Sequence, residues 1–487
     1  MVDHSLDQFP VAVIGAGPIG LAAAAHLAER NVPFVVLEAG DTAAAAVRSW
    51  SHVQLFSPWE YNTDPAARRL LAEAGWQEPD ASELPTGGDL VKQYLQPLAE
   101  LPALAPHIHY GSTVTALSRL GTDRLRTAGR EQAPFVVRLA DGEELLARTV
   151  IDASGTWRQP NAVGANGLPA HGEQDAAAWI THGLPDVFGA DRDQHAGHHT
   201  VVVGAGHSAA NTLLALAELA DAAPGTSITW AIRSADPSAS FGGGSDDELP
   251  ARGALGSGLK MLVDTGRVTL AANFRTHSIR RAGDNQVELV STQGGEQSIT
   301  ADRIVAATGF RPDYGISDEL RLELDPIMSA PRALAPLIDP NQHSCGTVTP
   351  HGYRELAHPE PGYYIVGMKS YGRAPTFLML TGYEQVRSIA AALAGDLESA
   401  QSVELQLPET GVCSVTAGGE AIALRLGLSK EEHEQLLHVT AKYLGTSATA
   451  ADAVLSAATE LGIDHTAALQ LAAYAADQFD APGATGC

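Results

Sequence analysis

The chain opens with a short run of apolar residues, Val11–Ile14, which a glycine-rich turn separates from an alanine-rich stretch. A continuous apolar run of four residues is typical of a buried strand, and the longer alanine-rich stretch is typical of a helix. A second apolar run, Phe34–Leu37, follows and ends in Glu38. The pattern therefore predicts a strand, a turn, a helix and a second strand, which is the start of a parallel α/β sheet.

The same N-terminal stretch has an alternative interpretation as an apolar helix directed to a membrane. Such a segment needs a basic flank and an uninterrupted apolar core. Here the preceding residues are MVDHSLDQFP, and the run is broken by Gly15, Gly17, Pro18 and Gly20. The sequence therefore favours the glycine turn over the membrane segment.

The spacing of this turn predicts a dinucleotide-binding site. Gly15 suits the tight turn, Gly17 allows the backbone to approach a pyrophosphate, and Gly20 allows the helix to pack on the strand. Pro18 stands with them as a candidate binding residue. Glu38, 23 residues after Gly15, suits hydrogen bonds from ribose hydroxyls and would repel a 2′-phosphate. The first site is thus expected to hold FAD or NAD.

A second unit of the same kind occupies residues 200–220, "TVVVGAGHSAANTLLALAELA". Its candidate binding residues are those of the turn, namely Gly204, Gly206, His207 and Ser208. Its next apolar run, "SITWAIRS", ends in Arg233 and Ser234, which can hold a 2′-phosphate. We therefore predict NADPH rather than NADH at the second site; the alternative is an arginine that is merely solvated at a strand end.

Two further apolar runs stop at small-residue turns, "RTVIDASGTW" at 148–157 with Gly155 and "DRIVAATGFRPD" at 302–313 with Gly309. Such turns suit points where the chain crosses between two nucleotide domains beside a flavin. The insertion of the second unit between them predicts two nested Rossmann-like domains in an α/β fold. The expected FAD-binding domain comprises residues 1–160 and 300–395, and the expected NADPH-binding domain comprises residues 161–299.

Residues 396–487 show apolar positions at helical spacing and predict a C-terminal appendage of three or four helices. Ser429 and Asp464 are placed as N-caps, and Glu432 completes a capping box with Ser429. These helices would mediate dimerisation or cover the substrate entrance, and the sequence does not choose between the two roles.

Charge and cysteine content narrow the class of protein. The 487 residues carry a formal net charge of -26, which disfavours nucleic acid and anionic membranes as partners. Three cysteines, Cys345, Cys413 and Cys487, are too few for a disulfide scaffold and include no C-x-x-C pair. No zinc spacing is met, so no metal site is expected. We expect a cytoplasmic protein, because no signal peptide or membrane span is evident.

The four glycine-containing segments, in this order, resemble the class B flavin-containing monooxygenases over about residues 10–395. The resemblance implies FAD at the first turn, NADPH at the second, and a domain junction at Ala307–Phe310 that includes Thr308 and Gly309. Trp50 resembles the tryptophan that follows the ribose-binding acid in those enzymes; its alternative role is a core or interface aromatic. The family's stretch F-x-G-x-x-x-H-x-x-x-Y/F before the second turn has no recognisable counterpart.

The segment at 362–396 predicts a strand, a loop and a helix that begins near Pro375. Members of the superfamily aim such a helix at the flavin, so the resemblance implies that Arg373 and Thr376 lie near the isoalloxazine. The alternative is a helix cap and a surface arginine.

The stretches around Cys345 and Cys413 also resemble actinobacterial flavoproteins encoded in arsenic-resistance operons. That resemblance implies a thiolate pair able to hold trivalent arsenic, because soft ligands select soft centres. One buried and one surface thiol is the alternative interpretation.

The sequence thus leads to an NADPH-dependent FAD monooxygenase that uses O₂ and a C4a-hydroperoxyflavin to oxygenate a small molecule at N, S, Se or As. The rival hypothesis is an NAD(P)H-dependent reductase of the thioredoxin-reductase kind, for which Cys345 and Cys413 would have to meet in space. A third hypothesis is a non-enzymatic flavin-binding redox sensor.

Overall fold

The computed structural model describes most of the chain up to residue 403 and parts of the C-terminal region. The described residues are 6–242, 247, 249–283, 285–292, 297–340, 351–403, 405, 428, 430–443, 449–463, 468 and 471. The chain divides into two compact units, one made of residues 1–339 and 343–412, the other of residues 340–342 and 413–487.

The first sheet of the larger unit has five parallel strands. In spatial order they are β16 (Tyr363–Ile365), β7 (Thr149–Asp152), β1 (Val11–Ile14), β2 (Phe34–Leu37) and β3 (Ile108–His109). The bounds of β1 and β2 are those that the apolar runs predict, because each run is buried on both faces of the sheet.

Helices cover one face of this sheet and a small antiparallel sheet covers the other. Val11 and Val13 point toward the helical core, which contains α1 (Pro18–Glu29), α3 (Pro65–Glu73) and α10 (Met379–Leu393). Ala12 and Ile14 point to the opposite core, which contains β4 (Val114–Arg119), β5 (Phe135–Leu139) and β6 (Glu144–Ala147). The alternation along β1 therefore builds three layers around one sheet.

The second sheet repeats this plan with other segments of the chain. Its parallel strands, in spatial order, are β11 (Thr269–Ala271), β10 (Ser227–Ala231), β9 (His199–Val203), β15 (Arg303–Ala306) and β8 (Ile180–His182). One face packs on α7 (His207–Ala222) and α8 (Pro250–Asp264). The other packs on β12 (Thr276–Arg281), β13 (Val287–Ser291) and β14 (Gln297–Ala301).

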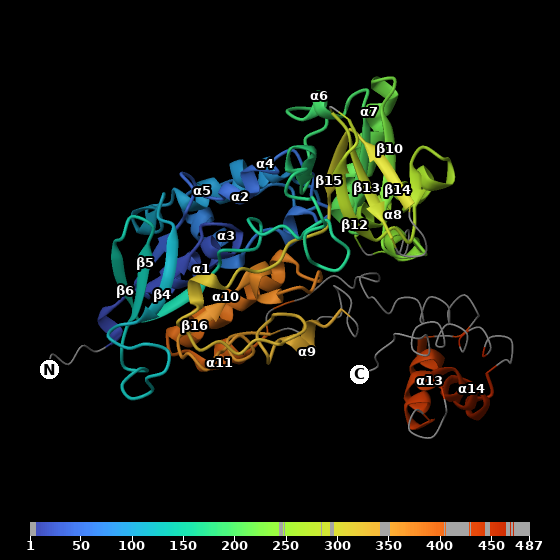
Figure 1. Cartoon of the computed structure of the whole chain (residues 1–487). Helices are drawn as coiled ribbons and strands as arrows, with labels where there is room; N and C mark the ends of the chain where they lie inside the picture. Colours follow the sequence, from blue (N-terminus) through green and yellow to red (C-terminus); the bar gives the residue numbers. More distant parts are fainter. Residues whose placement is uncertain are drawn as a thin grey trace. The chain divides into compact units, whose positions relative to one another are not determined.

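The two units of the sequence pattern are nested, as Figure 1 shows by colour: the orange elements β16 and α10 lie with the blue elements of the N-terminal region, and the green and yellow elements form the second sheet. The predicted α/β class with two Rossmann-like units is confirmed. The exact domain boundaries stay predictions; β15, which follows the predicted boundary at residue 300, pairs within the second sheet.

Shorter helices fill the connections. They are α2 (Ala45–Arg48), α4 (Gly87–Asp89), α5 (Gln96–Ala99), α6 (Arg192–His195), α9 (Ala335–Ile338) and α11 (Leu397–Gln401).

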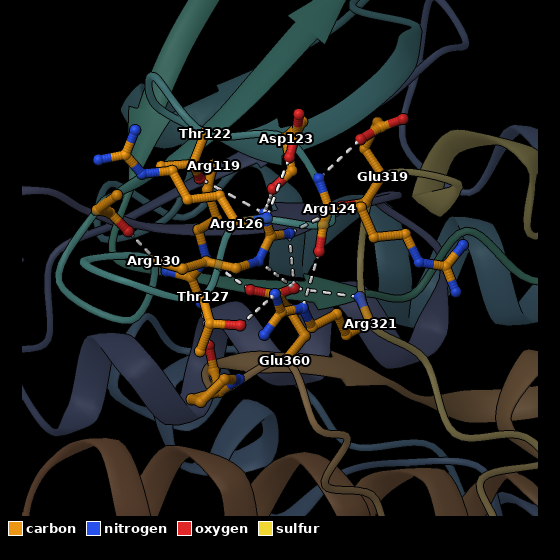
Figure 2. Close-up of polar contacts among 12 residues, drawn as sticks. Arg119, Thr122, Asp123, Arg124, Arg126, Thr127, Arg130, Glu319, Arg321 and Glu360 are labelled. Atoms are coloured by element: carbon orange, nitrogen blue, oxygen red, sulfur yellow. Dashed lines mark hydrogen bonds and ion pairs between the residues drawn. The ribbon is translucent and has the colours of Figure 1, made fainter.

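The buried carboxylate of Glu360 holds the loop after β4 against two other segments of the larger compact unit (Figure 2). Glu360 accepts hydrogen bonds from Arg119 Nε at 2.8 Å, from Arg130 Nη2 at 2.8 Å and from the Arg321 backbone N–H at 3.1 Å. Burial alone would raise the pKa of Glu360, but hydrogen bonds from Arg130 and Arg119 lower it. Three segments far apart in the sequence therefore meet at one charged group.

The smaller unit contains α13 (Lys430–Tyr443) and α14 (Ala450–Leu461). Leu436, Val439, Ala457 and Ala458 form its core with other small apolar residues. Glu432 lies on α13, whereas the predicted N-caps Ser429 and Asp464 lie outside the described residues. Among the described residues, no helix is long and apolar enough to cross a membrane.

Candidate active site

The first glycine turn joins β1 to α1 and leaves the N-terminus of α1 without a side-chain cap. Gly15 has φ of 101°, and a Cβ there would lie 2.8 Å from the carbonyl oxygen of Ala153. A Cβ on Gly20 would lie 1.9 Å from the carbonyl oxygen of Gly15, so both glycines permit close backbone packing. A Cβ on Gly17 would have nothing within 4 Å.

The open space at Gly17 is where the predicted pyrophosphate would lie. The amides of the first turn of a helix and its positive dipole end favour an anion, and Pro18 at the start of α1 is compatible with that geometry. The residues present therefore fit a dinucleotide at the first turn.

Glu38 lies directly after β2 and is held against the same turn. Its Oε2 accepts a hydrogen bond from the Ala16 backbone N–H at 2.6 Å, and its Oε1 accepts one from the Gly40 N–H at 2.7 Å. Each carboxylate oxygen keeps a second lone pair. The side chain is thus fixed in a position from which it can accept hydrogen bonds from a ribose.

The second glycine turn, between β9 and α7, has the same construction. Gly204 has φ of 135°, and a Cβ there would lie 2.1 Å from the carbonyl oxygen of Ala307. A Cβ on Gly206 would have nothing within 4 Å, and α7 has no side-chain cap. Ala209 takes the place of the third glycine and is buried. These residues fit a second dinucleotide.

Arg233 and Ser234 are exposed just beyond the end of β10; Arg233 is the second residue after that strand, whereas Glu38 is the first residue after β2. The Arg233 guanidinium donates to the carbonyl oxygen of Ala165 at 3.1 Å, and Ser234 Oγ donates to the carbonyl oxygen of Asp236 at 2.7 Å. An exposed guanidinium held by one hydrogen bond keeps donors for a phosphate.

His207, the first residue of α7, contacts Phe56 of the first Rossmann unit. Its ring centroid lies 5.0 Å from that of Phe56. Burial lowers the pKa of His207, and the charge of Arg252 lowers it further, so the imidazole is neutral near pH 7. Its neighbour Ser208 uses its carbonyl oxygen to accept from Thr212 Oγ1 at 2.9 Å.

The two segments that connect the Rossmann units run side by side. Asn161 donates its backbone N–H to the carbonyl oxygen of Gly309 at 2.9 Å and its side-chain amide to that of Thr308 at 3.0 Å. Thr308 Oγ1 returns a hydrogen bond to the carbonyl oxygen of Asn161 at 2.8 Å. Gly155 and Gly309 both have positive φ, 70° and 80°, which explains a glycine in each turn.

Aromatic rings stack beside these connecting segments. Trp157 and Phe310 have ring centroids 4.7 Å apart and a 28° interplanar angle, and Trp50 lies 6.5 Å from Trp157. A Cβ on Gly87 would lie 2.6 Å from the Trp50 ring, so the indole rests on that glycine. Trp50 therefore packs against the protein in this structure; a contact with the cofactor stays a prediction.

A buried ion pair lies next to the first connecting turn. Lys369 Nζ lies 2.7 Å from Asp152 Oδ2 and donates to Ser154 Oγ at 3.0 Å. Tyr363 donates its hydroxyl to the same Asp152 oxygen at 3.0 Å. Burial raises the pKa of Asp152, but Lys369 and Ser154 together lower it below its ordinary value. Sequence reasoning missed this pair, although a lone lysine in the apolar run "YYIVGMKSY" signals a buried partner.

The helix predicted from Pro375 begins later, at Met379. Thr376 is buried, and its Oγ1 donates to the carbonyl oxygen of Ile338 at 3.4 Å, so this residue belongs to the preceding loop. Arg373 is exposed, and its backbone N–H donates to the carbonyl oxygen of Met328 at 2.7 Å. The expected roles of both residues at a flavin stay predictions.

The first turns of α1 and α10 meet. A Cβ on Gly382 would lie 2.5 Å from Ile19 Cδ1, and one on Gly367 would lie 3.1 Å from Ile19 Cγ1. Neither helix has a side-chain cap, so both present free amide groups at the same end of the sheet.

A cavity of about 200 Å³ lies at the start of α10. Apolar side chains from two segments form most of its wall, namely Leu55, Phe56, Phe377, Leu378, Met379 and Leu380. Leu249, directly before α8 of the second Rossmann unit, completes it. Residues of both Rossmann units therefore line the cavity.

The predicted cysteine chemistry is not tested, because Cys345, Cys413 and Cys487 lie outside the described residues. In the part of the chain that is described, no cluster of three or more histidine, cysteine or acidic residues could hold a metal ion.

Residues 12–345 match the model of the family described as pyridine nucleotide-disulphide oxidoreductase. The chain belongs to this family. Its indole-3-pyruvate monooxygenase relative from Oryza sativa subsp. japonica, YUCCA1, is 32% identical over 200 residues, which are 40% of this chain and 42% of that enzyme. The chain thus matches less than half the length of this relative.

Several solved structures share the fold of this chain. Bacillithiol disulfide reductase from Bacillus cereus has a TM-score of 0.57 at 17% identity, over 80% of this chain and 99% of that one. The cadaverine monooxygenase of Erwinia amylovora has a TM-score of 0.55 at 15% identity, over 83% and 99%. Flavin-containing monooxygenase from Stenotrophomonas maltophilia has a TM-score of 0.51 at 20% identity, over 80% and 98%.

The family member described here is therefore a flavin-dependent oxidoreductase of the two-dinucleotide-binding kind. The resemblance to class B flavin-containing monooxygenases is confirmed at this level, and family membership supports both predicted cofactors, FAD and NADPH. The arsenic-resistance subfamily stays a prediction.

Proposed function

We propose that this flavoprotein is an NADPH-dependent FAD monooxygenase that transfers one oxygen atom of O₂ to a small-molecule nucleophile. The observation that carries the proposal is the pair of glycine turns with opposite charges at the following strand ends. Gly17 and Gly206 each leave open space at an uncapped helix N-terminus, whereas Glu38 and Arg233 differ in sign. An acid suits a ribose without a 2′-phosphate, and a guanidinium suits one with it.

The chain's own residues would bind and orient the two cofactors. Glu38 would accept the adenosine ribose hydroxyls of FAD, and the amides of α1 would bind its pyrophosphate. Arg233 and Ser234 would hold the 2′-phosphate of NADPH. His207 and Ser208 begin α7, and the turn before them would face the pyrophosphate. When bound, the flavin supplies hydride acceptance and oxygen activation, which no side chain can supply.

Water exclusion is the remaining task of the protein. The mostly apolar walls of the cavity at the start of α10 would exclude water from the part of a substrate that enters it. The buried Lys369–Asp152 pair fixes the Ser154–Gly155 turn beside the first site. Gly155, Thr308 and Gly309 would line the connection between the two sites, and Arg373 would approach the flavin from its exposed loop.

The rival function is a reductase of a disulfide, quinone or metal ion. Fold similarity to bacillithiol disulfide reductase at 17% identity does not distinguish it from a monooxygenase. Such reductases of the thioredoxin-reductase kind generally use a closely spaced redox dithiol, and the sequence contains no C-x-x-C pair. The indole-3-pyruvate monooxygenase that is 32% identical over 200 residues favours oxygenation.

A stopped-flow experiment tests the proposal. The FAD-loaded protein is reduced with NADPH under anaerobic conditions and mixed with oxygenated buffer without substrate, and the absorbance spectrum is followed with time. We expect a transient species that absorbs in the near ultraviolet before the oxidised flavin spectrum returns. Direct return to the oxidised spectrum, with no transient, would contradict the monooxygenase and favour the reductase.

A further inference from the structure

The cavity at the start of α10 has a mostly apolar wall. Besides its apolar residues, it is lined by Ser57, Tyr61 and Asn62. None of the ten residues that line it, all of them within the described part of the chain, carries a charge or a thiol. The wall therefore offers apolar contact and a few neutral polar groups.

Internal hydrogen bonds already occupy the polar groups of Asn62. Its side-chain amide donates to the carbonyl oxygens of Ser57 at 2.7 Å and Pro58 at 2.8 Å, and its Oδ1 accepts from Ser57 Oγ at 3.1 Å. Its own carbonyl oxygen accepts from Tyr383 at 2.9 Å. These bonds tie residues 57–62 to one another and leave the Asn62 side chain with little capacity to solvate an ion.

The size of the cavity limits its occupant. A dry apolar cavity of about 150 Å³ is sufficient for benzene. The cavity here, of about 200 Å³, is somewhat larger, so an aromatic ring with a short substituent would fit.

We propose that this cavity is the substrate site and that it selects a neutral, largely apolar molecule, such as an aryl or arylalkyl thioether, over charged amines and over arsenite. This inference rests on the proposed function and narrows its substrate class. A protonated amine would lose hydration with no carboxylate among the lining residues to pair with, and arsenite would find no thiolate and only three polar side chains there. A neutral sulfide has a soft, nucleophilic sulfur and loses little hydration on entry.

The atoms and electrons of the oxygenation reaction balance when FAD and NADPH are the cofactors. A sulfide, O₂, NADPH and one proton give a sulfoxide, water and NADP⁺. The sulfur lone pair forms the new S–O bond, the O–O bond breaks, and the second oxygen atom leaves as water with electrons from NADPH.

A matched set of three probes tests the proposal on the full-length FAD-loaded protein at pH 7. Benzyl methyl sulfide and N-methylbenzylamine have nearly the same shape, but the amine is protonated at this pH; arsenite is the third probe. Binding is measured by equilibrium dialysis without NADPH, and oxygenated product is measured separately with NADPH and O₂. We expect the sulfide to bind at least about tenfold more tightly than the amine or arsenite, and to be converted to its sulfoxide.

Two variants assign the effect to the cavity. Met379 is the first residue of α10, where an acidic side chain is compatible with the helix dipole. Met379→Glu places a carboxylate in the wall and is expected to reverse the preference toward the amine by about tenfold or more. Met379→Gln, of similar size and neutral, is expected to keep the preference for the sulfide. The FAD content of both variants shows whether they are folded.

The outcomes separate the two proposals. Equal or tighter binding of the amine or arsenite to the unmodified protein, or no binding of the sulfide, would overturn the selectivity of the cavity. Loss of the preference in Met379→Gln as well as in Met379→Glu would also overturn it. Preferred binding of the sulfide without sulfoxide formation would support the cavity and overturn the monooxygenase.

Discussion

At the scale of single residues, Glu38 and Arg233 follow the corresponding strands β2 and β10 of the two Rossmann units and carry opposite charges. Glu38 is fixed by two backbone N–H groups, whereas Arg233 is exposed and makes one hydrogen bond to the backbone. The surrounding turns are alike in their glycine geometry, so we propose that the opposite charges reflect different ligands. One side chain at each strand end would then distinguish the nucleotides.

Replacement of Arg233 with alanine is expected to weaken NADPH binding by roughly 10- to 100-fold, because a charge-assisted hydrogen bond contributes about 1.5–3 kcal/mol. Binding of NADH should change little. The dissociation constants of both nucleotides, measured by titration of the FAD-loaded protein, check this prediction. Arg192→Ala, which removes an exposed arginine on α6 that lies 41 residues before Arg233, is the control. An equal loss for NADPH and NADH would refute the role of Arg233.

Replacement of Lys369 with methionine is expected to destabilise the protein by about 3–5 kcal/mol at pH 8, because Asp152 would remain buried without its cation. The pKa of Asp152 is lowered in the native protein, so the pair contributes stability above pH 4 and loses it as pH falls through that lowered pKa. In the variant burial raises the pKa of Asp152, so the carboxyl takes up a proton at higher pH.

The difference in unfolding free energy between the unmodified protein and Lys369→Met should therefore be smaller at pH 5 than at pH 8. Urea unfolding at both pH values measures this difference. Lys260→Met, which removes the exposed Lys260–Asp264 pair on α8, is the control and should change stability by less than about 1 kcal/mol. An equal loss of stability at both pH values would show that protonation of Asp152 does not contribute to it.

At the scale of elements, the glycines of the first turn have separable roles. Gly17 faces open space with φ of -79°, whereas a side chain on Gly20 would meet the backbone of Gly15. Gly20 therefore serves the packing of α1 on β1, and we propose that Gly17 serves the ligand.

Gly17→Val is therefore expected to give a folded protein without bound FAD, whereas Gly20→Val is expected to lose about 3 kcal/mol or more of stability through overpacking. Circular dichroism and thermal unfolding measure the fold, and the flavin absorbance of the purified protein measures FAD. A yellow Gly17→Val protein would remove FAD from the first turn.

The apolar patterns predicted the elements of the two sheets better than their termini and partners. β1 and β2 have the predicted bounds because a buried parallel strand is a continuous apolar run. The start of α10 was predicted four residues early, since Pro375 is compatible with a first helical turn, but Thr376 bonds to Ile338 instead. The Lys369–Asp152 pair and the wall of the cavity depend on contacts between segments hundreds of residues apart, which no local pattern contains.

At the scale of the whole molecule, the chain forms two compact units with separate cores. The cofactor turns, the connecting segments and the cavity all belong to the larger unit. A unit with its own core can in principle fold alone.

A protein that ends at residue 412 is therefore expected to fold, to bind FAD and to oxidise NADPH at a rate within about threefold of the full chain. The flavin-to-protein ratio and the NADPH consumption rate check this. A colourless or insoluble product would show that residues 413–487 are needed for the larger unit.

The nested order of the strands also means that neighbouring strands of the first sheet are synthesised at different times. β7 ends at Asp152, but its neighbour β16 begins at Tyr363, about 210 residues later, and a ribosome adding about 5–20 residues per second needs roughly 10–40 s to supply it. The second sheet, complete at Ala306, can close within that interval. Until β16 emerges, one edge of β7 has no partner and can pair with another nascent chain. Production of the native protein should therefore respond to translation speed and to chaperones that shield this edge.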